Sequence, residues 1–205
     1  MNADSKRIYL HRTLKRDLRA GRYAPGEHLD VAALADEHGV SGAPIRIALH
    51  QLLGEGLIED QQREGLHVPL LDEEELRQRY EWMRRLTMMA CEPPARPCAP
   101  ATPISTARTP DIATQTWQLF DSIAEQAELK DLRTAIQQTN DQLAPIRHAK
   151  LNLIPNATSE LAELVRLWEK HDLANLQAEL HVYFERRKML VTRIATILRA
   201  RHAQR

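Results

Sequence analysis

Six prolines lie between Glu92 and Asp111, and they limit the possible fold more than any other feature of this 205-residue sequence. They occupy positions 93, 94, 97, 100, 103 and 110. Proline lacks the backbone N–H that a helix needs and favours extended backbone, so we expect a loop over residues 92–111. The rest of the sequence predicts two parts, residues 1–70 and 71–205, with this loop inside the second.

The first 70 residues predict three short helices followed by a two-stranded hairpin. Leucines at every fourth position predict the first helix. Asp30 can cap a second helix, which Gly39 ends, and Ser41 can cap a third, which Gly56 closes. Residues 57–68 carry apolar ends around a polar segment, which is typical of a short hairpin. Three helices and a hairpin in this order are the pattern of a winged helix-turn-helix, a DNA-binding fold.

The part after residue 70 predicts helices only. One helix should open at residues 73–75, and about four more should follow the loop. The first of these contains Trp117, and Pro145 should kink or end the second. The third follows Pro155, and the last runs from Asp172 nearly to the end of the chain. The expected fold class is therefore mainly α, with an N-terminal winged helix-turn-helix followed by an all-helical bundle.

Charge and cysteine content narrow the class of protein. The 28 basic and 28 acidic residues give a formal net charge of zero, so any contact with nucleic acid needs a local basic face. No apolar run approaches the length of a membrane span, and we expect a cytoplasmic protein without a membrane partner. Cys91 and Cys98 flank the first three of the six prolines; we expect reduced thiols, although a redox switch between them stays open.

A specific run of residues strengthens the winged-helix prediction. Its order and spacing closely resemble the GntR family of bacterial regulators, and the all-helical second half is similar to the FadR branch, here with a shortened effector domain. The run consists of Leu14, Leu18, Gly21, Pro25, Gly26, Leu29, Leu34, Ala35, Gly39, Val40, Ser41, Pro44, Ile45, Arg46, Ala48, Leu49, Leu52, Glu55, Gly56, Leu57 and Ile58.

The resemblance places a recognition helix after Ser41. The positive end of its dipole can face a phosphate, and Arg46, one turn further, can reach the major groove. Arg63, beside the wing glycine, can enter the minor groove or touch phosphate. The basic side chains of residues 6–19 are either a solvated face or phosphate contacts. The predicted DNA-binding residues are Ser41, Gly42, Ala43, Arg46, His50, Gln51 and Arg63.

Two positions depart from the family pattern. Gly42 stands where the family has an arginine, and Ile47 stands where it has an acidic residue. The missing arginine removes an expected base or phosphate contact, so the operator sequence of relatives does not carry over. His50 and Gln51 are candidates for contacts that read the DNA sequence. The alternative is that they are merely exposed on the flank of the helix.

The resemblance also implies an effector domain that binds a divalent metal through an aspartate and histidines, and the metal helps to hold a carboxylate effector. Helix register places these positions near Thr116, Phe120, Leu161 and Tyr183, none of which is a metal ligand of the expected kind. The histidines at 148, 171 and 181 share no regular ligand spacing. We therefore expect no metal and no other cofactor.

Aromatic side chains offer a different kind of ligand site. An apolar pocket could be lined by Trp117, Phe120, Trp168 and Tyr183 or Phe184, and would take an apolar or aromatic effector. The alternative, which such spacing favours more often, is that these side chains form the core.

The expected function is a dimeric transcriptional repressor that binds double-stranded operator DNA and is relieved by a small-molecule effector. The alternative is a winged-helix protein-interaction module whose specific DNA binding is lost or weakened. An enzyme is not expected, because the sequence shows no nucleophile–base pairing and no phosphate-binding glycine loop.

Overall fold

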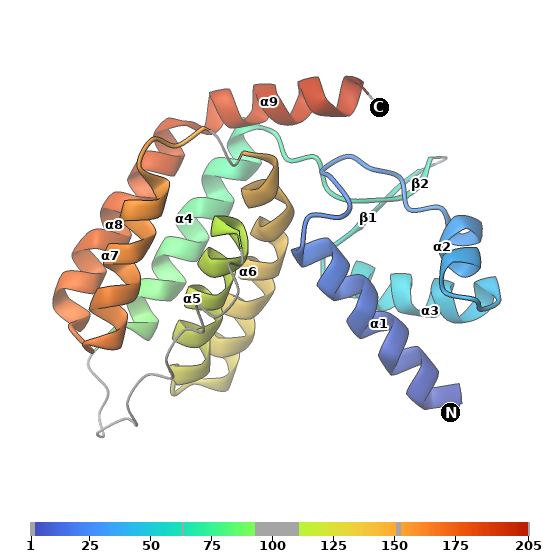
Figure 1. The fold of residues 1–205 in the computed structure, drawn as a ribbon, viewed down its shortest axis with the longest axis horizontal. Helices are drawn as coiled ribbons and strands as arrows, with labels where there is room; N and C mark the ends of the chain where they lie inside the picture. The colour runs from blue at the N-terminus through green and yellow to red at the C-terminus, as the bar shows by residue number, and fades with distance from the viewer. Residues whose placement is uncertain (1–2, 63, 93–110, 151–152, 205) are drawn as a thin grey trace.

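The computed structural model describes residues 3–62, 64–92, 111–150 and 153–204, with the side chains of residues 3 and 4 excepted. Helices dominate this part of the chain, and one two-stranded sheet accompanies them, as the sequence predicts (Figure 1). No helix within these residues is long and apolar enough to cross a membrane.

The N-terminal part has the predicted order of three helices and a hairpin. Strands β1 and β2 pair antiparallel with Glu59 opposite His67, and an isolated bridge joins His67 to His28. Gly39 turns the chain between the second and third helices with a φ of 60°, a conformation that suits glycine. The elements are α1 (Ala3–Arg19), α2 (Val31–Glu37), α3 (Gly42–Gly54), β1 (Glu59–Gln61) and β2 (Gly65–His67).

The predicted capping hydrogen bond is present at the start of α2 and absent at the start of α3. Asp30 caps α2, because its Oδ1 accepts the backbone N–H of Ala33 at 2.7 Å. Ser41 occupies the N-cap position of α3, but its side chain makes no capping hydrogen bond. The predicted position of the cap is confirmed and its predicted hydrogen bond is absent.

The second part of the chain is a helical bundle. Asp72 begins it with a capping box, in which its Oδ1 accepts the backbone N–H of Glu75 while the Glu75 side chain accepts that of Asp72. The helices are α4 (Glu73–Ala90), α5 (Ile112–Gln126), α6 (Lys130–Ala149), α7 (Ala157–Glu169), α8 (Leu173–Met189) and α9 (Val191–Ala203).

Two details of this bundle were predicted differently. Of the two outcomes predicted for Pro145, a kink or a helix end, the helix end is wrong: α6 continues to Ala149, and Leu143, Ala144 and Ile146 around the proline are buried. The predicted last helix is two helices that separate at Leu190, so that α9 turns from α8 toward the winged helix (Figure 1). No glycine or proline marks this break, and Val191, Ile194 and Leu198 after it are buried in the second core.

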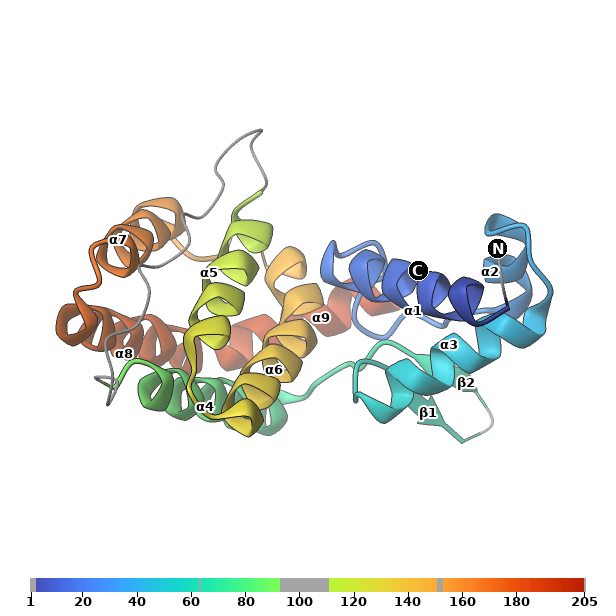
Figure 2. The ribbon, with the colours of Figure 1, turned by 90° about the horizontal axis from the view of Figure 1, so that it is seen from below.

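The described residues form two separate hydrophobic cores. One contains buried side chains from Leu10 to Val68, and the other contains those from Leu71 to Leu198. Seen from below, α1 of the first part lies beside α6 of the second (Figure 2). Val68 is the last buried residue of the first core, and Leu70 already packs against the second. The division into domains at residue 70 stays a prediction. Most of the expected loop, residues 93–110, lies outside the described residues.

Candidate nucleic-acid interface

Helix α3 presents two different faces. Ile45, Ala48, Leu49 and Leu52 have no exposed surface and pack into the first core. Ala43, Arg46, His50 and Gln51 are all exposed, and so is Ser41 at the N-cap. The structure therefore brings most of the predicted DNA-binding residues together on the outer side of one helix, where they can reach a ligand.

The N-terminal turn of α3 faces a groove. Residues 28–32 before and within α2 line it, together with Ala35, Gly42, Arg46 and the β2 residues Gly65 and Leu66. A Cβ on Gly42 would lie 3.4 Å from both the Arg46 Nη2 and the Val31 Cγ1. The Arg46 guanidinium thus lies next to Gly42, and a larger side chain at position 42 would leave it less room. Arg63 lies outside the described residues.

Two of the basic side chains of α1 are committed to the protein itself. The Lys15 Nζ lies 2.7 Å from the Glu55 Oε2 and 3.2 Å from the Asp141 Oδ2. Arg19 donates from Nε and Nη2 to Asp141 at 2.6 and 2.8 Å. These ion pairs exclude Lys15 and Arg19 as free phosphate contacts in this conformation. Arg12 and Arg16 are exposed, although Arg16 also donates to the neighbouring Asp17.

The junction of the two cores centres on Asp141 of α6. Its side chain is 2% exposed and also accepts the Trp117 Nε1–H at 2.9 Å. Beside it, the Gln138 Nε2 donates to the Glu55 backbone oxygen at 2.8 Å and the Gln142 Nε2 donates to that of Gly56 at 3.2 Å. Helix α6 is therefore fixed to α1 and to the C-terminal end of α3. This junction was not predicted from the sequence, because its partners lie far apart along the chain.

The predicted aromatic ligand residues do not share one pocket. Phe120, Tyr183 and Phe184 pack against one another with ring centroids 5.0–5.7 Å apart in the second core. Trp117 lies at the junction with α1, under the Arg19 guanidinium at 4.6 Å. Trp168 lies at a different end of the bundle. Most of these side chains are therefore part of the hydrophobic core, which was the alternative to a ligand pocket.

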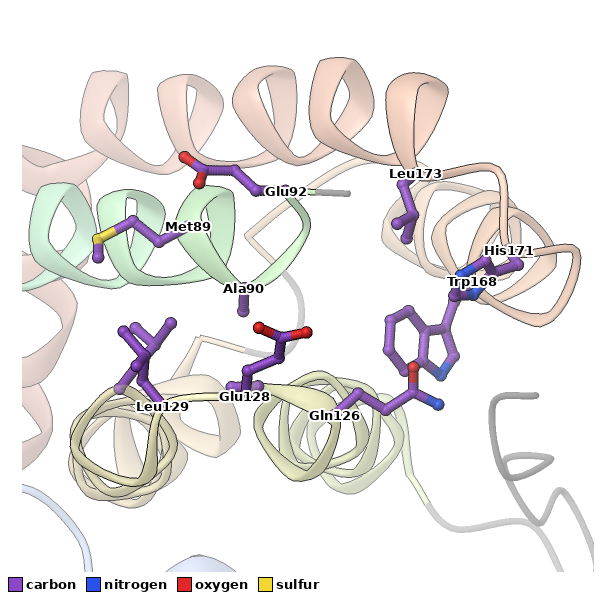
Figure 3. A pocket seen from close by; sticks show the side chains of 11 residues that line it. Met89, Ala90, Glu92, Gln126, Glu128, Leu129, Trp168, His171 and Leu173 are labelled. Carbon is purple, nitrogen blue, oxygen red and sulfur yellow. The ribbon is translucent and has the colours of Figure 1, made fainter. Parts of the chain in front are cut away.

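Trp168 lines a cavity of about 170 Å³ between the ends of α4, α5 and α8 (Figure 3). Its Nε1 is buried without a hydrogen-bond partner. Gln126, the last residue of α5, and Glu128, in the turn after it, reach toward the same space. The full lining is Met89, Ala90, Glu92, Gln126, Ala127, Glu128, Leu129, Leu132, Trp168, His171 and Leu173.

The side chains expected near the metal positions are not ligands. Leu161 and Phe120 are buried apolar residues, and the Thr116 hydroxyl donates to the Ile112 backbone oxygen at 2.7 Å. Across the ranges that the structure describes, no three His, Cys, Asp or Glu side chains are grouped to hold a metal ion. His148 bonds the Arg19 backbone oxygen, while His171 and His181 are exposed. The absence of a bound metal in the protein stays a prediction.

Cys91 at the end of α4 is fully buried, and burial raises the pKa of its thiol to about 12. A thiol of this kind stays protonated and unreactive at neutral pH. Cys98, its expected neighbour in the loop, lies outside the described residues.

Residues 6–68 match the model of the family described as bacterial regulatory proteins, gntR family. A transcriptional regulator GntR from Rhodococcus sp. RHA1 has a similar structure, with a TM-score of 0.71 at 14% identity over 91% of this chain and 97% of that chain. E. coli McbR/YncC gives a TM-score of 0.63 at 17% identity over 94% and 99%. At these identities the structural likeness establishes the fold. No curated protein sequence matches the chain.

Proposed function

We propose that this chain, a DNA-binding transcription regulator with a gntR-family domain over residues 6–68, is a homodimeric repressor whose operator binding is relieved by a small-molecule effector. The observation that carries the proposal is the exposed outer face of α3, with Arg46 beside a groove between α2 and the hairpin. The helical domain, residues 71–205, would supply dimerisation and ligand control in a cytoplasmic protein.

In this proposal the N-terminal part of α3 enters the major groove of the operator. Arg46 lies one turn from the helix start and can donate two hydrogen bonds to a guanine or bind a phosphate. The backbone N–H groups at the start of α3 have no side-chain cap from Ser41, so they can bind a phosphate oxygen. The hairpin would lie along the adjacent backbone, where Arg63 is expected.

The zero net charge favours specific over indiscriminate binding. Electrostatic attraction to phosphates supplies most of non-specific affinity, and this chain has no overall field to provide it. Exposed cations at Arg12, Arg16 and Arg46 give the α1 and α3 surface a local basic character instead.

The dimer contact is proposed on α4 and α8, which pack against each other. Each carries two large apolar side chains that are about half exposed or more: Trp82 and Met89 on α4, and Val182 and Met189 on α8. Apolar surface of this kind is typical of protein contacts. A two-fold dimer would place two winged helices on the half-sites of a palindromic operator.

Effector control is proposed to act through α6. Arg147 donates to the Asn140 side chain and Asn140 donates to the Trp117 backbone oxygen, at 2.8 and 2.9 Å. Trp117 and Arg19 both donate to Asp141, so these contacts run from the bundle interior to α1. A ligand that moves α6 would thereby change the position of the winged helix against the bundle.

Sequencing of genomic fragments recovered with the purified full-length protein tests this function. We expect a short palindromic motif upstream of a limited number of genes, and loss of that motif with Arg46→Ala. Arg193→Ala, an exposed arginine on α9, is the matched control. Recovery of fragments without a shared motif would contradict the proposal and favour the protein-interaction module.

A further inference from the structure

Helix α3 carries one large apolar side chain on its outer face. Ile47 is 39% exposed, whereas Ile45, two positions earlier, has no exposed surface. Ile47 also stands at one of the two positions where the sequence departs from the family pattern, which has an acidic residue there. Part of the surface of this isoleucine is therefore free to contact another molecule.

Ile47 lies near the middle of the outer face of α3. At about 100° per residue, it is roughly 150° around the helix from the middle of the buried stripe. The exposed Arg46 and Gln51 lie on either side of it, and the exposed Ala43 lies one turn earlier on the same face. A ligand that covers this face therefore meets the Ile47 side chain near its centre and the Arg46 guanidinium at its edge.

The position of Ile47 along α3 also suits a contact with bases. The helix begins at Gly42, so Ile47 lies within its first two turns. The N-terminal residues of a recognition helix are the ones that contact base edges. Arg46 borders the groove between α2 and the hairpin, and Ile47 is turned from that groove toward the outer face.

An isoleucine side chain can recognise one feature of the major groove. It has no hydrogen-bond donor or acceptor, so it cannot bond to the polar base edges. The C5-methyl group of thymine is the apolar group that the major groove displays. A carboxylate at the same position would accept from the amino group of a cytosine, and phosphates would repel it. Isoleucine in its place therefore favours thymine over cytosine.

We propose that Ile47 contacts the methyl group of a thymine in each operator half-site, close to the base pair that Arg46 contacts. Consecutive Cα atoms are about 3.8 Å apart, which is close to the rise of about 3.4 Å per base pair, so the two contacts should lie within about two base pairs of each other. The inference rests on the proposed function, because it assigns a base preference to the same helix.

Replacement of thymine by deoxyuridine tests the proposal, because it removes the methyl group and keeps the base pairing. Gel-shift titrations use the full-length protein and the recovered motif, in which each symmetry-related pair of thymines is replaced in turn. We expect one pair whose replacement weakens wild-type binding about tenfold to twentyfold, since burial of one methyl group strengthens binding about fourfold at each half-site. The same replacement should weaken binding by Ile47→Ala less than about twofold, because the contact is already lost.

Ile8→Ala is the matched control. It removes the same atoms from another exposed isoleucine of the same part of the chain, on α1, and should keep the full dependence on the methyl group. Alanine has a higher helix propensity than isoleucine, so both variants should fold, and thermal melting checks this.

Three results would overturn the inference. The first is a motif in which no deoxyuridine weakens wild-type binding. The second is equal weakening for the wild type and Ile47→Ala, which would show that the shape of the DNA is read in place of the methyl group. The third is loss of the dependence in Ile8→Ala as well. Recovery of no shared motif would refute the proposed function, and this inference with it, so the two failures are told apart.

Discussion

Replacing Asp141 by asparagine should loosen the junction between the winged helix and the bundle. The side chain of Asp141 is 2% exposed and binds Arg19, Lys15 and the Trp117 indole. Asparagine can still accept from Trp117, but it loses the charge that two cations share. Breaking a buried ion pair costs about 3–5 kcal/mol when one partner is removed.

The expected magnitude is smaller than that limit. The side chains of Arg19 and Lys15 are 31% and 23% exposed, so both regain contact with water when their partner becomes neutral. We therefore expect Asp141→Asn to lower the free energy of unfolding by about 2–3 kcal/mol, which is less than the cost of breaking a fully buried ion pair. In a chain of this length, each kcal/mol shifts the melting temperature by about 2–4 °C, which gives a decrease of roughly 4–12 °C.

Thermal melting followed by circular dichroism measures this shift, and hydrogen exchange locates it. Protection should fall in α1 and α6 while the core of α3 stays protected. Glu179→Gln, an exposed carboxylate on α8, is the control and should leave the melting temperature within about 1–2 °C. In the double variant, Arg19→Gln should lower the melting temperature little beyond the effect of Asp141→Asn alone, because both substitutions remove the same ion pair. A melting temperature for Asp141→Asn equal to that of the control would show that Asp141 does not stabilise the junction.

The reading helix, the metal content, the oligomeric state and one ion pair can each be tested separately. Arg46→Ala should weaken operator binding by about 1–3 kcal/mol in gel-shift titrations without changing the melting temperature, and unchanged affinity would show that α3 is not the reading surface. Elemental analysis of untagged protein should find no stoichiometric zinc, nickel or manganese; one retained metal per chain would contradict this. Sedimentation should show a dimer that Trp82→Glu weakens, whereas a wild-type monomer at binding concentrations would remove the palindromic model. Hydrogen bonds, first from Arg84 and then from Arg85 and Lys188, lower the pKa of Glu81 below its ordinary 4.5. Its stabilisation is therefore complete above about pH 4.5 and declines progressively as the pH falls toward the lowered pKa of the folded protein, so Glu81→Gln should destabilise the protein at pH 7 more than at pH 3.

The local pattern of the sequence predicted the winged helix well. Leucine spacing located α1, Asp30 located the start of α2, and the apolar side of α3 was the side that is buried. These features depend on residues within a few positions of one another, which is the range that periodicity and capping report.

Contacts between distant residues were beyond that range. Asp141 and Arg19 are 122 positions apart, and nothing in the surroundings of either residue indicates the ion pair. The break at Leu190 lacks a helix breaker because it depends on packing against other helices. The burial of Lys150 and Arg187 was not predicted for the same reason. In the sequence they are basic residues near helix ends, and only the packing of the helices shows that both are buried.

A competition measurement tests directly whether the protein recognises a specific DNA sequence. The affinity of the full-length protein for its recovered motif is compared with that for a scrambled duplex of equal length and charge, at physiological salt. We expect a ratio on the order of 10³ or more. A ratio near one would contradict it, because phosphate contacts alone would then account for all of the binding.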